Sequence, residues 1–183
     1  MKERYTENNK TKSAGKEIQM MNDQSLDGII NYLQKQTNNE IEKEIDFACS
    51  SCYDFQSYPP INVSIFEDKD KYFRSQNKPN SWFCLYFKNH QVIPTYYTIR
   101  TYGSNTNSHP KRRVIEGSND DSSWTNLDTQ NESPHLLKGW IVHTFNINNS
   151  NSYKYIRMRK TGKSKNNNVS LLIDSFEIYG TLI

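Results

Sequence analysis

The chain has 183 residues, a formal net charge of +3 and 34% hydrophobic residues, with 12 Tyr, 8 Phe and 3 Trp among them. This length suits one ordinary domain with a tail, and the aromatic residues can supply a packed core. The mild charge gives no reason to expect nucleic acid as a partner, and no segment is apolar over the length of a membrane span.

The first 23 residues are polar and lack hydrophobic periodicity, so we expect residues 1–23 to be a disordered tail. No apolar run follows the charged residues at the start of the chain, so the pattern is not that of a secretory signal. We therefore expect a cytoplasmic location.

A short helix and a linker are expected over residues 24–44. Leu26, Ile29, Ile30 and Leu33 recur at helical spacing, which predicts a helix over 26–36 with Ser25 as its N-cap. The apolar stripe of this helix must be covered, either by the side of the following domain or by a preceding domain that this chain lacks.

From residue 45 onward the sequence predicts β-structure. The run Trp82–Phe87 is almost continuously apolar, as in a central strand, and 91–101 is rich in β-branched and aromatic residues. Polar turns separate the predicted strands, and no strand–helix alternation is present. An antiparallel sandwich or barrel is therefore expected over 45–183. The other predicted strands are 45–51, 113–116, 125–127, 140–146, 154–160 and 171–179.

The three cysteines are Cys49, Cys52 and Cys84, and an odd number without a signal sequence favours reduced thiols. The Cys49-x-x-Cys52 spacing fits half of a zinc knuckle or a redox pair, and it also fits ordinary core or strand positions. No second Cys pair or nearby His completes a metal site. The acidic pairs Asp68/Asp70 and Asp120/Asp121 do not follow a calcium-loop pattern. We expect neither a metal nor a cofactor.

Three local patterns occur in a characteristic order. They are Ser50-Ser51-Cys52-Tyr53-Asp54, then Asn80-Ser81-Trp82-Phe83-Cys84-Leu85-Tyr86-Phe87, and then Glu116-Gly117-Ser118-Asn119-Asp120 with Trp124, Tyr155-Ile156-Arg157 and Phe176-Glu177-Ile178-Tyr179-Gly180. In this order and spacing, residues 45–183 resemble the coagulation-factor 5/8 type C (discoidin) family of galactose-binding-like folds. The resemblance implies an all-β, antiparallel jelly-roll β-sandwich that binds its ligands with loops at one end.

The resemblance also shows a departure, because extracellular members usually join the start of the domain to its end by a disulfide. Here Cys49 lies near the start, but no cysteine lies near Gly180. The chain looks more like the intracellular members found in BTB-containing proteins of protists. It is then either a shortened relative or a part of a BTB-containing substrate adaptor for ubiquitin ligation.

By this resemblance, ligand-binding residues are expected on the loops 53–59, 67–79 and 102–112, with 162–168 at the rim. Aromatic, charged and histidine side chains on these loops could stack on and hydrogen-bond to a ligand. Each aromatic could instead pack beneath its own loop. The candidates are Tyr53, Asp54, Phe55, Tyr58, Tyr72, Arg74, Tyr102, His109, Lys111, Arg112 and Lys163.

Two other features have a functional and a structural interpretation. Arg157 and Arg159 would share a strand face within a basic cluster that includes Lys163 and Lys165, either as a binding stripe or as the solvated face of an edge strand. The residue types of the segment Glu116 to Asp120 would suit a functional site, but we expect a structural role in which Gly117 permits a sharp turn. Trp140 is expected to be a core or loop anchor.

The four His residues are scattered along the sequence, and no nucleophile motif accompanies them, so we expect no catalytic residues and no enzyme. The sequence favours a non-enzymatic binding module that recognises a protein through its loop end, since Tyr and Arg are favoured in protein interfaces. A glycan is the alternative ligand, and an anionic membrane surface is a further one.

Overall fold

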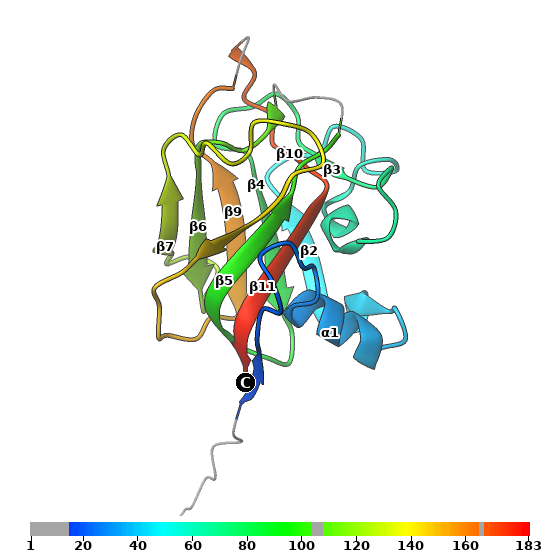
Figure 1. Ribbon diagram of the computed structural model, residues 1–183, viewed down its shortest axis with the longest axis vertical. Coiled ribbons are helices and arrows are strands. Elements are labelled where there is room, and N and C mark those ends of the chain that lie inside the picture. Colours follow the sequence, from blue (N-terminus) through cyan, green and yellow to red (C-terminus); the bar gives the residue numbers. More distant parts are fainter. Residues whose placement is uncertain (1–14, 104–107, 165–166) are drawn as a thin grey trace, which may run out of the picture.

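The computed structural model describes residues 15–103, 108–164 and 167–183, in which two antiparallel β-sheets pack face to face (Figure 1). One sheet has the strand order β1-β11-β5-β8, the other β2-β4-β9-β6-β7, and β3 and β10 form a separate pair. The predicted jelly-roll sandwich is confirmed. The strands are β1 (Lys16–Ile18), β2 (Ile45–Cys49), β3 (Phe73–Arg74), β4 (Trp82–Phe87), β5 (Val92–Arg100), β6 (Arg113–Ser118), β7 (Thr125–Gln130), β8 (Val142–Asn146), β9 (Tyr155–Lys160), β10 (Leu172–Ile173) and β11 (Ser175–Leu182).

The core lies between the two sheets, and alternation along the strands decides which side chains enter it. In β4, Phe83, Leu85 and Phe87 are fully buried. The Phe83 ring meets the rings of Phe73 and Phe176 edge to face, with centroids 5.8 and 5.2 Å apart. Aromatic side chains from both sheets and from β3 therefore hold the layers together.

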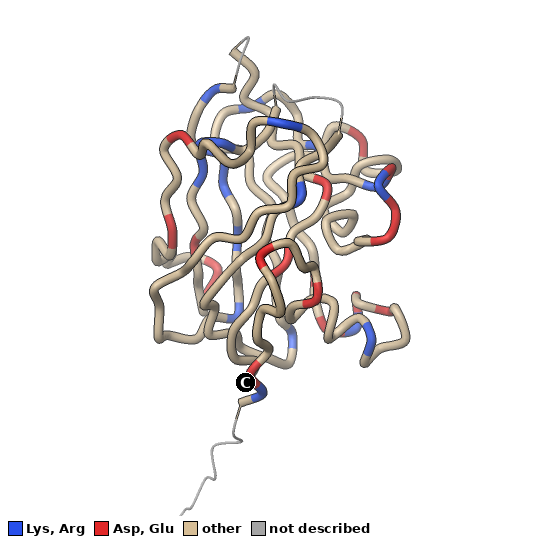
Figure 2. Tube along the Cα trace, in the orientation of Figure 1, with Lys and Arg blue, Asp and Glu red and all other residues tan. Residues whose placement is uncertain are grey.

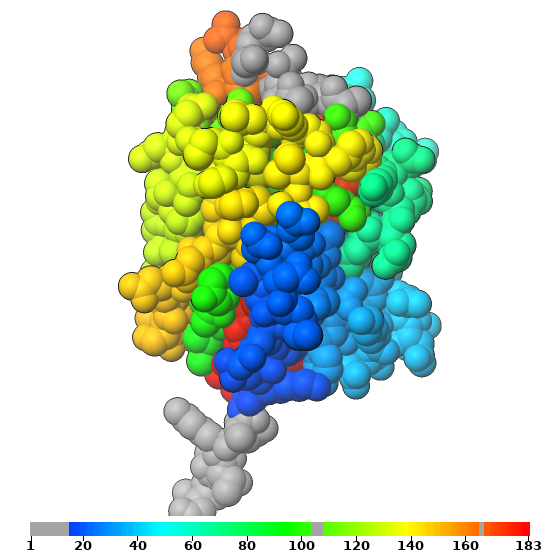
Figure 3. Space-filling model, in the orientation of Figure 1, coloured from blue at the N-terminus to red at the C-terminus, as the bar shows by residue number. Residues whose placement is uncertain are grey.

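The N-terminal segment corrects the prediction of a disordered tail up to residue 23. Residues 1–14 lie outside the described part of the chain, but β1 pairs with β11, opposing Lys16 to Leu182 and Ile18 to Gly180. The segment then crosses the outer face of the sheet (Figure 3). There the hydroxyl of Tyr179 donates to the carbonyl of Ser25 at 2.7 Å. These long-range bonds order a sequence that has no periodicity of its own.

The predicted helix exists but begins later than expected. Helix α1 is Ile29–Gln36, and short 3-10 helices follow at η1 (Ile41–Lys43) and η2 (Pro60–Ser64). Gly28, not Ser25, stands at the N-cap position, and it has no side-chain cap of its own. The buried stripe of α1 packs against β11, so the helix covers the side of its own domain.

The cap of α1 comes from the other end of the chain. Glu177 of β11 is fully buried, and its two carboxylate oxygens accept from the backbone N–H of Ile30 at 2.8 Å and of Asn31 at 3.0 Å. The N–H of Ile178 also donates to this carboxylate, at 2.8 Å. One side chain thus satisfies helix donors that would otherwise be unpaired.

Gly117 does not form the sharp turn that we expected. It lies inside β6, opposite Thr125 and Ile156, and a Cβ atom there would come within 2.6 Å of the Tyr153 ring. The irregularity is the register shift between Ile115 and Glu116. Gly117 is therefore needed for close packing within a strand.

The predicted basic stripe is neutralised in part. β9 lies between β4 and β6 and is not an edge strand. The guanidinium groups of Arg157 and Arg159 lie 2.7 and 2.8 Å from the two carboxylate oxygens of Glu116. Arg157 also stacks 3.8 Å from the ring centroid of Trp124. Lys165 of the predicted cluster lies outside the described residues. In Figure 2, positions of both charge signs are spread over the molecule.

Candidate recognition surface

A line of five aromatic rings joins four loop segments, which lie at the end of the sandwich opposite the C-terminus (Figure 1). We call it the aromatic row, and it comprises Tyr53, Tyr58, Tyr72, Tyr102 and Trp140. Its successive ring centroids are 6.1, 4.7, 4.0 and 5.9 Å apart, within the range of favourable aromatic pairs. The row therefore forms one continuous aromatic surface made from residues distant in sequence.

The two ends of the row are exposed, and a cation lies beside each. Tyr53 is 58% exposed and Trp140 is 42% exposed, whereas the three middle rings are half-buried. The guanidinium of Arg74 lies 4.1 Å from the Tyr53 ring centroid, and the ammonium of Lys69 lies 5.2 Å from that of Trp140. These cation–π contacts hold both ends of the row in place.

The middle of the row is formed by the closest ring contacts, with Tyr72 4.7 Å from Tyr58 and 4.0 Å from Tyr102 between centroids. Burial, together with the neighbouring phenols of Tyr58 and Tyr102, raises the pKa of Tyr72 well above its usual range. Tyr72 therefore stays neutral, and it acts as the ring on which the loops at 53–58 and 102 converge.

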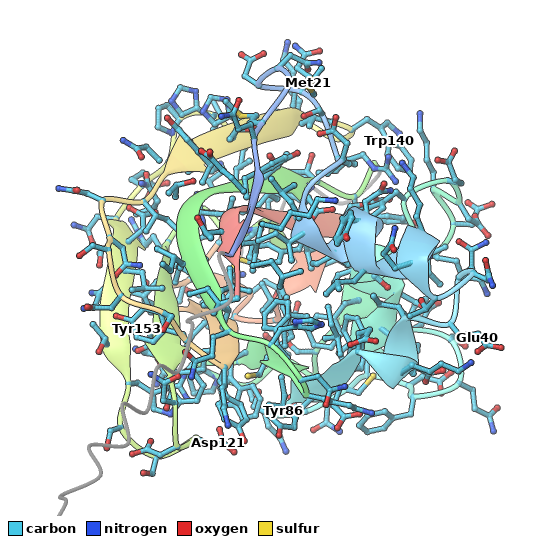
Figure 4. All side chains as sticks on the ribbon, turned by 90° about the horizontal axis from the view of Figure 1, so that it is seen from below. Met21, Glu40, Tyr86, Asp121, Trp140 and Tyr153 are labelled. Carbon is cyan, nitrogen blue, oxygen red and sulfur yellow. The ribbon has the colours of Figure 1, made fainter. Side chains whose placement is uncertain are left out.

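Trp140 is the residue that the sequence did not assign to the site, since we expected a core or loop anchor. It lies at the periphery of the molecule (Figure 4). Its backbone has a positive φ of 59°. Its indole covers Gly103, where a Cβ atom would come within 2.0 Å of the ring. A Cβ on Gly139 would meet the Gly103 carbonyl oxygen at 1.9 Å. The two glycines let the segments approach and so present Trp140 to solvent.

The other two candidates of the first loop do not join the row. The Asp54 carboxylate accepts from the backbone N–H of Gln56 at 2.9 Å and from the hydroxyl of Ser57 at 2.7 Å. These hydrogen bonds lower its pKa. Phe55 is 65% exposed and lines a groove beside β2. Asp54 thus shapes the loop, and Phe55 belongs to another surface.

His109 is a support and not a surface residue, which corrects its assignment as a ligand-binding candidate. Its side chain is fully buried, with ring nitrogens 2.9 Å from the carbonyl oxygen of Tyr102 and 3.3 Å from that of Leu136. Burial lowers its pKa. Lys111 is half-buried, and its carbonyl accepts from the N–H of Ser133. Both residues fix the loop that carries Tyr102.

Arg112 and Lys163 form a separate contact at the rim. The Arg112 guanidinium lies 2.6 Å from a carboxylate oxygen of Glu132 and donates to the carbonyls of Asn131 and Lys163, at 3.0 and 3.4 Å. Arg112 thus has carboxylate and carbonyl partners within its own fold. The structure does not bring this pair into the aromatic row.

Two buried cations form hydrogen bonds to backbone and side-chain groups of the loops. The Lys160 ammonium donates to the carbonyl of Ser170 at 2.7 Å and to the hydroxyl of Ser164 at 2.8 Å, and burial lowers its pKa to about 8. Arg113 is fully buried and donates to the Tyr97 hydroxyl at 2.8 Å and to the carbonyl of Pro110 at 3.0 Å. The loop end is therefore a preorganised surface.

The described residues contain no group of three or more His, Cys, Asp or Glu side chains that could hold a metal ion. Cys49, Cys52 and Cys84 are free thiols in this structure, and burial raises the pKa of Cys49 to about 11. The His residues are less scattered than expected, because the rings of His135 and His143 stack with centroids 3.8 Å apart. Among the described helices, none is long and apolar enough to cross a membrane.

Comparison with solved structures supports the fold. The chain is similar to a carbohydrate-binding module of Clostridium perfringens in complex with GalNAc-β-1,3-galactose, with 8% identity and a TM-score of 0.61 over 74% of this chain and 94% of that one. It is also similar to the family 32 module of NanJ from C. perfringens in complex with galactose. That match has 10% identity and a TM-score of 0.60, over 75% of this chain and 95% of that one. A fucolectin from Morone saxatilis matches with 15% identity and a TM-score of 0.60, over 75% of this chain and 47% of that one. At these identities the likeness shows a galactose-binding-like jelly-roll fold.

Comparison with known sequences gives one further finding. The chain is 28% identical over 114 residues to the E3 ubiquitin-protein ligase Ufd4 of Drosophila melanogaster. The match covers 60% of this chain and only 4% of the ligase, so the chain spans a small part of that relative's length. No family model matches the chain.

Proposed function

We propose that this protein is a non-enzymatic recognition module that binds a protein partner through the aromatic row. The observation that supports this most is the continuity of the row, in which five rings from four loop segments form one surface. Tyr and Trp are the residues most enriched at the energetic centres of protein interfaces. Rigid aromatic side chains also lose little conformational entropy on binding.

The polar groups near the row favour a protein over a sugar. Recognition of a sugar needs several polar side chains that are free to bond its hydroxyl groups. Among the described neighbours, Asp54 is bound within its own loop, His109 is buried between carbonyls, and Arg112 is paired with Glu132. What remains is aromatic surface with Arg74 and Lys69 at its ends, which suits side chains of a folded or extended polypeptide.

A carbohydrate ligand is the second candidate, because solved relatives of the same fold are complexes with galactose and with GalNAc-β-1,3-galactose. The exposed rings of Tyr53 and Trp140 could each stack on a sugar face. An anionic membrane surface is a third possibility that the exposed aromatics and cations allow, with salt-sensitive attachment as its signature.

We further propose that recognition takes place in the cytoplasm. The three thiols are free, and two of them are buried, which fits a reducing compartment. The partial match to a ubiquitin ligase is compatible with a module that presents or selects proteins within a larger assembly. A role as part of a BTB-containing adaptor stays a hypothesis.

The test is quantitative affinity capture from cytosolic extract with intact protein, Trp140→Ala and Tyr53→Ala, followed by titration of the captured partner. Loss of either exposed aromatic anchor should weaken binding about 30-fold, which corresponds to ~2 kcal/mol. Phe55→Ala is the matched control, since Phe55 is an exposed aromatic of the same loop that lies outside the row.

Equal affinity of all four proteins would refute recognition through the row. Saturable binding of galactose or a glycan, lost in Trp140→Ala, would establish the second candidate instead. Sedimentation with phosphatidylserine vesicles that salt abolishes would establish the third.

A further inference from the structure

One edge of the five-stranded sheet is open. The strand order β2-β4-β9-β6-β7 places β2 at the end of the sheet, with β4 as its sheet neighbour. An edge strand presents unpaired backbone donors and acceptors, on which another strand can form. β2 is therefore the place to ask what a second chain could bind.

The pairing with β4 shows which groups of β2 are free. The N–H of Lys88 donates to the carbonyl of Glu44, and the N–H of Ser50 donates to the carbonyl of Trp82. Antiparallel bonding alternates from residue to residue, and the register opposes Phe47 to Leu85. The N–H and C=O groups of Phe47 consequently point away from β4. No backbone hydrogen bond joins Phe47 to any other described residue on that side.

The same alternation applies to the neighbours of Phe47. Ile45 and Cys49 direct their backbone groups to the open side, whereas Asp46 and Ala48 bond to β4. The open side thus offers the backbone N–H and C=O groups of three alternate residues, Ile45, Phe47 and Cys49. An extended segment lying beside β2 could pair with them.

A groove runs along this open edge. Its volume is about 350 Å³, at the small end of the range for binding sites. Phe47 forms one wall, and the opposite wall comes from the start of η2 and the segment before it, with Phe55, Pro59, Pro60 and Ile61. Phe55 is 65% exposed there. The groove can accept the apolar side chain of a residue whose backbone pairs with β2.

The rim of the groove is acidic, although the whole chain carries a net charge of +3. Glu42 and Asp46 line it directly. The segment that leads into β2 contains four carboxylates, Glu40, Glu42, Glu44 and Asp46, and one ammonium group, that of Lys43. A ring nitrogen of His90 lies 3.3 Å from the Glu44 carboxylate. Lys88 already lies 2.7 Å from Asp46, and Lys43 is paired with Glu40. A partner with basic residues is therefore favoured, and a second copy of the same acidic edge is disfavoured.

We propose that the free edge of β2 is a second docking site, which binds an extended peptide segment of alternating basic and apolar residues by adding it to the sheet as a strand. Backbone bonds to Ile45, Phe47 and Cys49 would supply affinity, and an apolar side chain in the groove beside Phe55 would supply specificity. The basic residues would face the carboxylates at the rim. This site is independent of the aromatic row, so the protein could hold two partners at once.

The probe is a fluorescein-labelled synthetic peptide, Lys-Val-Lys-Phe-Lys-Val-Lys, titrated into the full chain and followed by fluorescence anisotropy. Two N-methylated isomers, each methylated at alternate residues, carry the same charge and the same side chains. Only one isomer should lose affinity, by about tenfold or more, because only one set of N–H groups faces β2. The acidic analogue Glu-Val-Glu-Phe-Glu-Val-Glu should not bind.

Variants of the protein locate the site. Phe55→Ala should weaken the peptide about tenfold, since it removes an exposed wall of the groove without touching the core. Phe47→Pro should remove binding, because proline deletes an N–H that takes no part in the ladder with β4. Tyr53→Ala is the matched control in the same loop and should leave peptide binding unchanged.

Several outcomes would overturn the proposal. These are absence of binding by the basic peptide, equal losses for the two N-methyl isomers, or unchanged affinity in Phe55→Ala. A concentration-dependent dimer in analytical ultracentrifugation that Phe47→Pro abolishes would show that a second copy occupies the edge. If the aromatic-row variants Trp140→Ala and Tyr53→Ala keep full affinity for the captured partner, the β2 site is not affected. If the basic peptide does not bind, the proposed function of the aromatic row is not affected.

Discussion

The buried carboxylate of Glu177 makes the stability of this protein depend on pH in a definite direction. Burial raises the pKa of Glu177 from 4.5 to about 7, although the backbone N–H groups that it accepts from oppose the rise. The unfolded chain releases this proton near pH 4.5, whereas the folded protein holds it until about pH 7. The folded state is therefore favoured below pH 4.5, and that advantage is lost as the pH rises through 7.

The size of the effect follows from the two pKa values. At 1.36 kcal/mol for each unit of pKa, a rise from 4.5 to about 7 corresponds to about 3 kcal/mol of unfolding free energy. Glu177→Gln cannot ionise, but it keeps an oxygen that can accept from the N–H of Ile30. The free energy of unfolding of the original protein minus that of the variant should therefore fall by about 3 kcal/mol between pH 4 and pH 8.

Urea unfolding of both proteins, followed by tryptophan fluorescence and far-UV circular dichroism, measures this difference at each pH. Contributions of other titrating groups cancel in the subtraction as long as they are not coupled to Glu177. A difference that does not change with pH would mean that folding leaves this pKa unaltered. A difference that grows with pH would mean that the N–H donors outweigh burial, and either result would refute the reasoning.

Three other predictions concern packing and the two surfaces. Gly103→Ala should reduce partner binding as much as Trp140→Ala, because its Cβ would displace the indole, and an unchanged far-UV spectrum would show that the fold is kept. Phe83→Ala should lower the unfolding free energy by ~3–5 kcal/mol in urea titrations, since it leaves a cavity between the sheets. A loss below about 1 kcal/mol would argue against that core. In hydrogen exchange followed by NMR, the amide of Phe47 should exchange much faster than that of Ala48 in the free protein. Equal protection would show that the edge of β2 is covered.

The sequence predicted the strands well where the signal is local. The six-residue apolar run of β4 is found at Trp82–Phe87 as expected, and β5 differs by one residue at each end. The start of α1 was wrong because its cap is Glu177, almost 150 positions further along the chain. The order of residues 16–23 was missed for the same reason, since it depends on pairing with β11.

The candidate site was predicted in part for similar reasons. Residue type and loop position were enough to identify Tyr53, Tyr58, Tyr72 and Tyr102, which the structure brings together. Trp140 could not be assigned, because its exposure depends on the close approach of Gly103 and Gly139. His109 was misassigned because nothing in the sequence shows that two carbonyls enclose its ring. A local pattern indicates which side chains are suitable, but only the fold decides which of them meet.

The pairing of β1 with β11 has a consequence for how the module can be built into a larger polypeptide. Because Lys16 lies opposite Leu182, the chain enters and leaves the sandwich at one corner. Domains whose ends lie together can be inserted into a surface loop of a host protein without separating the host's own segments. The loops that carry the aromatic row lie at the far end from that corner (Figure 1), so a host joined there would leave the row open to solvent.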